Sequence, residues 1–76
     1  MRANFVRSLI AELTPYEKRW LQDDASSVFS GALDAILACT EVINASLDPK
    51  INKGRLLRIV KQLKPDELRW ALDELC

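Results

Sequence analysis

Apolar residues along this chain recur every three or four positions, which is the spacing of one face of an α-helix. No stretch shows the sustained alternation of apolar and polar residues that predicts a β-strand. Ala, Leu, Glu, Lys and Arg dominate the composition, and these residues favour helices. The pattern predicts an all-α fold in which residues 1–76 form a single domain, a small bundle of four or five short helices.

The first two helices are predicted to meet at a proline. Apolar residues at helical spacing predict the first helix over residues 3–13. Thr14 then suits the N-cap of a second helix, because Pro15 fits the first helical position and Glu17 can complete a capping box. The second helix is expected to fade near Asp24.

The third helix is predicted to be the centre of the bundle. It should begin at Ser26 or Ser27 and reach about Ser46, and apolar residues cover most of its circumference. A helix that is apolar almost all round belongs in an interior. Nothing at residues 22–27 forbids continuity with the second helix, so both arrangements stay open.

A line of small residues runs along this predicted helix at four-residue spacing, formed by Gly31, Ala35 and Cys39. Small side chains let another helix approach closely, so the line indicates either packing inside the chain or a self-association seam. If it is a tight seam, Gly31→Leu should damage the fold or the assembly more than Ser30→Leu, because inserting a large side chain there overpacks the contact.

The C-terminal part repeats the N-terminal part. A fourth helix is predicted over residues 52–63, and Pro65 opens a fifth. Residues 5–21 and 55–71 share the pattern Leu-x-Pro-x-Glu-x-Arg-Trp at an offset of 50 residues. Two copies are too few for a solenoid. The echo instead predicts two helix–Pro–helix corners that flank the central helix.

Each corner carries one tryptophan. Trp20 and Trp70 follow their prolines by five residues, which places each ring on the face that turns back toward the preceding helix. We interpret both as buried structural anchors. The competing interpretation is an exposed aromatic pair that grips a partner.

The charges are segregated although the net charge is zero. Residues 11–48 carry an acidic excess, whereas residues 49–64 hold six basic residues and no acidic one. Such a basic face can bind an acidic protein, a second copy of the chain or nucleic acid, or it can offset the acids of this domain. The pI near 6.2 argues against a dedicated nucleic-acid binder. The basic residues are Lys50, Lys53, Arg55, Arg58, Lys61 and Lys64.

The side chains that most enzymes need are scarce. The chain has no histidine, the commonest general base and metal ligand. Its paired carboxylates are sequence neighbours, which do not face each other on a helix. No glycine-rich phosphate loop is present. We therefore expect no enzyme, no cofactor and no metal.

The sequence also bears on the compartment. No secretory signal is recognisable, and Asp34 and Glu41 interrupt the longest apolar stretch, which argues against a membrane span. Cys39 and Cys76 form neither a CxxC motif nor a disulfide framework. We expect a buried Cys39 thiol, an exposed Cys76 and a cytoplasmic location.

These observations favour a protein-interaction module over an enzyme. Helix-rich chains of this size are typical of accessory, regulatory or inhibitory factors of bacterial or phage type that bind another protein. A homodimer is expected as well, because so short a chain buries only about 60% of its unfolded surface. The alternative is a nucleic-acid-associated regulator that uses the basic helix over residues 50–64.

Overall fold

Helices and the turns between them make up the described part of the chain. The structure, a computed structural model, describes residues 1–29, 31 and 33–75, without the side chain of Phe29. These residues contain no β-strand, so the predicted all-α class is confirmed. The elements are α1 (Ala3–Ile10), α2 (Pro15–Trp20), the π-helical turn η1 (Leu21–Ala25), α3 (Ser26–Phe29), α4 (Ala35–Ala45), α5 (Lys53–Lys61) and α6 (Pro65–Glu74).

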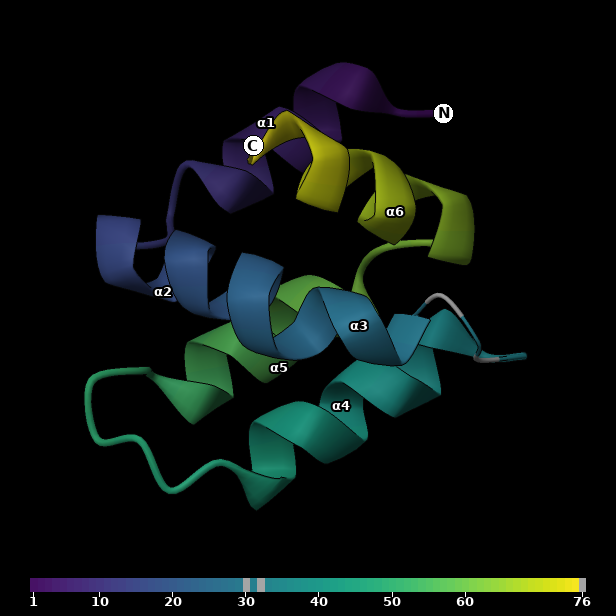
Figure 1. Cartoon of the computed structure of the whole chain (residues 1–76). Helices are drawn as coiled ribbons and strands as arrows, with labels where there is room; N and C mark the ends of the chain where they lie inside the picture. The colour runs from purple at the N-terminus through teal and green to yellow at the C-terminus, as the bar shows by residue number, and fades with distance from the viewer. Residues whose placement is uncertain (30, 32, 76) are drawn as a thin grey trace.

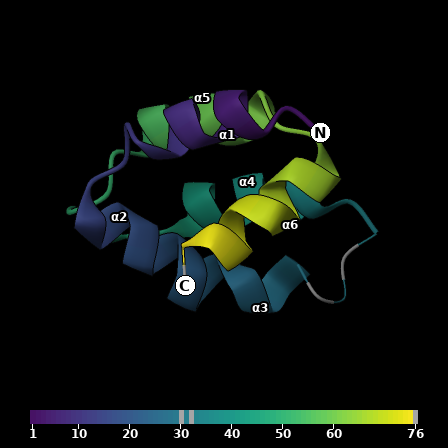
Figure 2. The ribbon, with the colours of Figure 1, turned by 90° about the horizontal axis from the view of Figure 1, so that it is seen from above.

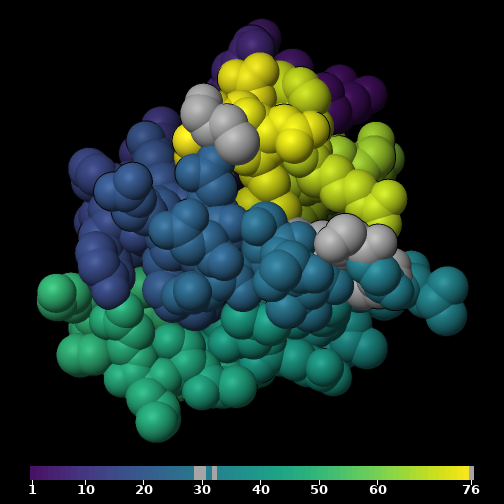
Figure 3. Space-filling view, in the orientation of Figure 1, coloured from purple at the N-terminus to yellow at the C-terminus, as the bar shows by residue number. Residues whose placement is uncertain are grey.

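The first and last helices lie together at one pole of the molecule. α1 packs against α6 at the top of Figure 1, and α4 packs against α5 at the bottom. Seen from above, α1 and α5 lie on one side, α2 and α3 on the other, and α4 and α6 between them (Figure 2). The space-filling view shows the purple N-terminal and yellow C-terminal segments as one joined surface (Figure 3).

The first predicted corner is confirmed. The Thr14 hydroxyl accepts a hydrogen bond from the Glu17 backbone N–H at 3.1 Å, and the Glu17 carboxylate accepts one from the Thr14 N–H at 2.9 Å. This capping box satisfies N–H groups that the first turn of a helix leaves without partners. Pro15 occupies the first helical position, as predicted.

The second helix continues directly into the third. α2, η1 and α3 follow one another without a break from residue 15 to residue 29. Leu21 and Ala25, which bracket the π-helical turn, are both buried. The structure thus decides for continuity where the sequence left two arrangements open.

The prediction of one central helix over residues 26–46 is wrong. The structure has two helices there, α3 and α4, with a turn between them. Asp34 has extended backbone angles, and its carboxylate accepts the Leu37 N–H at 3.0 Å as the N-cap of α4. Apolar periodicity runs through the break, but Gly31 is unfavourable inside a helix and aspartate prefers the cap. α4 therefore folds back onto α3 and η1.

The internal echo is a structural repeat. In the second copy Asn52 caps α5 by accepting the Arg55 N–H at 3.0 Å, and Pro65 opens α6. Residues at the same place in the two copies are buried alike, although they lie 50 positions apart. These pairs are Val6 and Leu56, Leu9 and Ile59, Leu13 and Leu63, and Glu17 and Glu67.

The interior also holds a thiol. Cys39 is free and fully buried, and burial raises its pKa to about 12. Cys76 lies outside the described residues. Among the helices of the described residues, none combines the length and the apolar character that crossing a bilayer requires.

Candidate functional site

Two fully buried carboxylates hold the two copies of the repeat together. Glu17 closes the first capping box, and its carboxylate also accepts the Asn52 N–H at 2.8 Å and the Arg55 guanidinium at 2.5 Å. Asn52 and Arg55 begin the helix of the other copy. The carboxylate therefore fastens α5 to the start of α2.

Glu67 makes the reciprocal connection. It accepts the Lys64 N–H at 2.9 Å within its own corner. It also accepts the Arg2 N–H at 3.1 Å and the Arg2 guanidinium at 2.8 Å. Arg2 precedes α1 as Asn52 precedes α5, so each copy sends the start of its first helix to the carboxylate of the other copy.

The protonation of these carboxylates follows from their partners. The Arg2 side chain, with the backbone N–H of Lys64 and Arg2, lowers the pKa of Glu67 to about 2. Burial acts to raise the pKa of Glu17, but the N–H groups of Thr14 and Asn52 and the Arg55 guanidinium outweigh it and lower the pKa. Both groups are ionised at neutral pH and act as structural hydrogen-bond acceptors.

Most of the predicted basic face has partners inside the chain. Arg55 binds Glu17, and Arg58 donates to the Glu12 carboxylate at 2.6 Å. The Lys53 ammonium donates to the Asn44 carbonyl at 3.1 Å.

The other lysines of this face differ from one another. The Lys50 ammonium lies 5.2 Å from the centre of the Tyr16 ring. Lys61 and Lys64 are exposed to solvent. The six basic residues therefore do not form one uncommitted surface, and two of them, Arg55 and Arg58, are paired with acids of the same domain.

The predicted seam does not lie along one helix. Gly31 is exposed in the turn before α4, whereas Ala35 and Cys39 are buried among core residues of the chain. A Cβ atom added at Gly31 would meet nothing within 4 Å. The three residues are thus separated because the helix that was expected to align them is broken.

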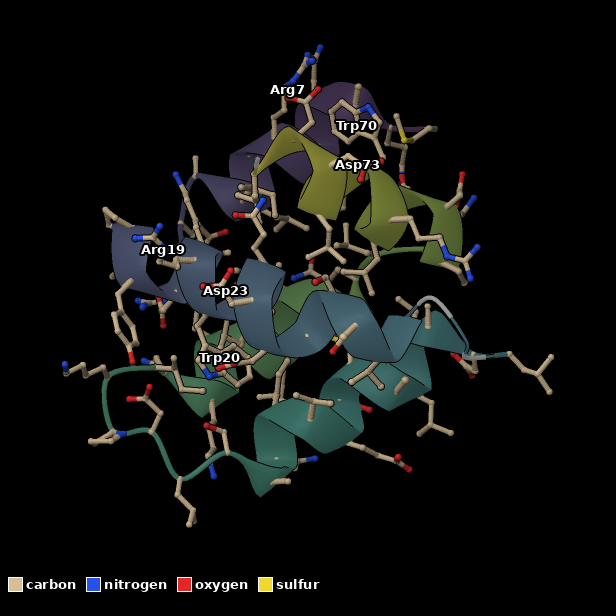
Figure 4. All side chains as sticks on the ribbon, in the orientation of Figure 1. Arg7, Arg19, Trp20, Asp23, Trp70 and Asp73 are labelled. Atoms are coloured by element: carbon tan, nitrogen blue, oxygen red, sulfur yellow. The ribbon has the colours of Figure 1, made fainter. Side chains whose placement is uncertain are left out.

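The two tryptophans differ in exposure, contrary to the expectation of equivalent corners. Trp20 is 7% exposed, while Trp70 is half-buried. In Figure 4 Trp20 lies beneath the α2–η1 helix, and Trp70 lies beside Arg7 at the top of the molecule. The Arg7 guanidinium carbon is 5.1 Å from the centre of the Trp70 ring, within the range of a cation–π contact.

A shallow groove surrounds Trp70 where α1 meets α6. It encloses about 240 Å³ and has an apolar floor with charged side chains around it. One of its charged pairs is loose, because the Arg7 and Glu74 charges are 3.7 Å apart and both side chains are largely exposed. We call this surface the α1/α6 groove; its lining residues are Arg7, Ile10, Ala11, Lys18, Trp70, Ala71, Glu74 and Leu75.

A second, smaller hollow touches the edge of Trp20. It encloses about 160 Å³ on the outer side of α2 and η1, and Asp23 and Asp24 line it. Arg19 forms an exposed pair with Asp23 at 3.9 Å. This hollow exposes only the edge of the buried Trp20 ring. The α1/α6 groove, in contrast, exposes part of the half-buried Trp70 ring.

Sequence reasoning singled out Trp70 but missed the groove around it. A signal was available in the repeat. Position 7 is arginine where position 57 is leucine, and position 18 is lysine where position 68 is leucine. Charged residues that replace leucines of the other copy mark the side of the repeat that is left open.

Neither the grouping of possible metal ligands among the described residues nor similarity to known proteins assigns a metal site or a family. Among the described residues, no three His, Cys, Asp or Glu side chains gather as metal ligands. The chain matches no protein-family model, no curated protein and no solved structure.

Proposed function

We propose that this chain is a protein-interaction module of accessory, regulatory or inhibitory type, which acts by binding another protein through the α1/α6 groove. The half-buried Trp70 ring with Arg7 above it carries the proposal. Tryptophan and arginine are the side chains that most often dominate binding energy at protein interfaces. Partial burial holds the ring in place while leaving area for a partner to cover.

The composition of the groove supports a protein partner. Ile10, Leu75 and Trp70 offer an apolar centre, and Arg7 and Lys18 stand at its edge. An apolar centre inside a charged rim is the usual arrangement of a protein–protein interface, where burial gives affinity and charge gives specificity.

Nucleic acid remains the alternative partner. It would have to use the basic helix over residues 50–64, where Arg55 and Arg58 already bind carboxylates of this chain. Phosphate contacts made by such residues would require these ion pairs to open. The groove is therefore the better supported surface.

The proposal includes a cytoplasmic setting and an absence of catalytic activity. The two cysteines form neither a CxxC motif nor a disulfide framework, which supports a reducing compartment. The tied carboxylates Glu17 and Glu67 support a binding role, since neither is placed to exchange protons near neutral pH.

Photo-crosslinking tests the proposal directly. A photoreactive phenylalanine analogue is placed at Ala11 in the groove or at Lys61, the exposed equivalent position in the other copy. In cells that make this protein, we expect an adduct with another protein from position 11 only. Excess wild-type chain should suppress this adduct, and excess Trp70→Ala chain should not.

The controls separate the two functions. Circular dichroism establishes that the Trp70→Ala competitor is folded. A nucleic-acid adduct from position 61 would favour the alternative. Failure to form any competed protein adduct at position 11 would refute binding through the groove.

A further inference from the structure

The repeat contains two equivalent notches between its helices, and α4 covers one of them. α4 packs against α5, η1 and α6. In terms of the repeat, these elements are the first helix of the second copy, the continuation of the second helix of the first copy, and the second helix of the second copy. α4 therefore fills a notch between three helical segments. It also contacts α3, which lies outside the repeated residues 5–21 and 55–71.

The α1/α6 groove is the same notch in the other copy. The offset of 50 positions relates α5 to α1 and α6 to α2. It also relates η1 of the first copy to the end of α6 in the second. The residues that line the groove come from these three helices: Ile10 from α1, Trp70 and Leu75 from α6, and Lys18 from α2. Nothing in the described part of the chain is placed there as α4 is placed at the other notch.

Burial at matching positions records the difference. Val60 and Ala25 are fully buried, while their counterparts Ile10 and Leu75 are only half-buried. Trp20 is buried and its counterpart Trp70 is half-exposed. Each comparison has the same direction, as expected if α4 covers one notch and the equivalent notch is open.

From this we infer that the groove receives a short amphipathic helix of the partner protein, seated against α1, α6 and α2 as α4 is seated against α5, η1 and α6. The inference rests on the proposed function and specifies the partner's chemistry. Helices that lay an apolar face in a groove are a recurrent mode of recognition.

Charge adds a second requirement. At the positions that match Leu57 and Leu68 of the second copy, the groove has Arg7 and Lys18. Among the described residues that line the groove, Glu74 alone carries a carboxylate, and it stands 3.7 Å from Arg7. The described lining residues therefore have a net positive charge, and the helix that fits them bears acidic side chains beside its apolar face.

The test uses α4 itself as the probe. A peptide of residues 34–46 with Cys39→Ala is titrated into the isotopically labelled chain. Four further peptides each carry glutamate at one of the half-buried positions beside the buried stripe of α4, and four carry lysine there. These positions are Ile36, Ala38, Thr40 and Val42.

We expect amide shifts in α1 and the end of α6, and a glutamate peptide that binds more tightly than its lysine counterpart. The difference should be about twofold to fivefold, as for an exposed ion pair. Lys18→Glu in the chain should reverse the preference. Lys61→Glu, on an exposed helix position outside the groove, is the matched control and should leave the preference unchanged.

Several outcomes would overturn the inference. They are the absence of saturable binding at millimolar peptide, shifts that map to α5 and η1, and equal affinity of the glutamate and lysine series. If these occur while position 11 still forms its protein adduct, the groove binds a partner through a segment that is not an acidic helix. If neither peptide binding nor the protein adduct at position 11 is observed, the proposed function is refuted as well.

Discussion

At the scale of single residues, similar sequence surroundings produce different environments. Trp20 and Trp70 both follow arginine and stand five residues after a proline. One is buried and the other is half-exposed under Arg7. The local pattern gives the two rings equivalent positions on their helices and pointed each toward the preceding helix. The Trp70 ring instead lies beside Arg7 of α1, a helix of the other copy.

Trp20→Ala should destabilise the chain far more than Trp70→Ala. Removing a buried tryptophan costs about 3–5 kcal/mol, and the half-exposed Trp70 loses less contact. Urea unfolding of both variants measures the difference.

Fluorescence quenching tests the same assignment. Acrylamide should quench Trp70, the remaining tryptophan of the Trp20→Phe variant, more strongly than Trp20, the remaining tryptophan of the Trp70→Phe variant. Equal losses of stability would contradict the assigned environments.

Gly31→Leu should be tolerated, which corrects the expectation of a tight seam. The space around a Cβ atom at Gly31 is open, and its backbone is not in the left-handed region. We expect a change in the free energy of unfolding below about 0.5 kcal/mol. Ala35→Leu is the contrast, since Ala35 is 1% exposed and overpacking there should cost about 1–3 kcal/mol. Thermal melting distinguishes the two variants.

At the scale of elements, helix starts organise the molecule. Each proline corner uses a buried glutamate twice, once to cap its own helix and once to hold the N-terminus of the other copy's first helix. The capping could be predicted, because it spans three residues. The second contact joins residues far apart in the chain, and no local pattern announces it.

Glu17→Gln should weaken the fold more than Glu12→Gln. Glu17 is fully buried with three groups of donors around it, and an amide cannot accept from all of them. Hydrogen bonds to a charged group contribute about 1.5–3 kcal/mol. The exposed Glu12–Arg58 pair contributes at most about 1 kcal/mol. Chemical denaturation at neutral pH measures the free energy of unfolding of both variants. Equal losses of stability in the two variants would contradict the prediction.

Acid should remove the contribution of Glu67 over a defined range. Its pKa falls from 4.5 to about 2 on folding, so the folded state binds fewer protons than the unfolded one. The stabilisation is present above pH 4.5 and is lost as the pH falls toward about 2.

Urea midpoints recorded across this range test the pH dependence. Arg2→Gln removes the main cause of the lowered pKa, so its stability should depend less steeply on pH than that of the wild type. A wild-type curve that stays flat, or a variant curve equally steep, would show that Glu67 is not held ionised by Arg2.

At the scale of the whole molecule, the repeat leaves the two poles unlike. α4 covers one of the two notches of the repeat, and the α1/α6 groove is the other notch, which stays open. The surface also keeps apolar side chains near the turn before α4, where Leu33 is fully exposed and Leu37 is 55% exposed. Leu33 and Leu37 therefore form an exposed apolar area that is distinct from the α1/α6 groove.

Self-association stays a prediction, now with a different surface. Ala35 and Cys39 are buried, so Leu33 and Leu37 are the side chains beside the turn that a second copy could cover. We expect light scattering at high micromolar concentration to show a dimer. Leu33→Ser with Leu37→Ser should give a monomer with unchanged helix content. A wild-type monomer at that concentration would end the dimer hypothesis.

The sequence by itself determined the helical class, the two proline corners and the internal repeat. These features depend on propensities, caps and spacings that act over three or four residues, as at Thr14 and Glu17. It also indicated the Trp70 corner, although not the groove around the ring.

The tertiary structure decided where the apolar stretch breaks, which basic residues are neutralised and which tryptophan stays open. The Arg55–Glu17 contact spans 38 positions and the Arg2–Glu67 contact spans 65. The physical reason is that burial and ion pairing depend on which helices meet. α4 can cover only one of two similar notches, so similar local sequences end in different surroundings.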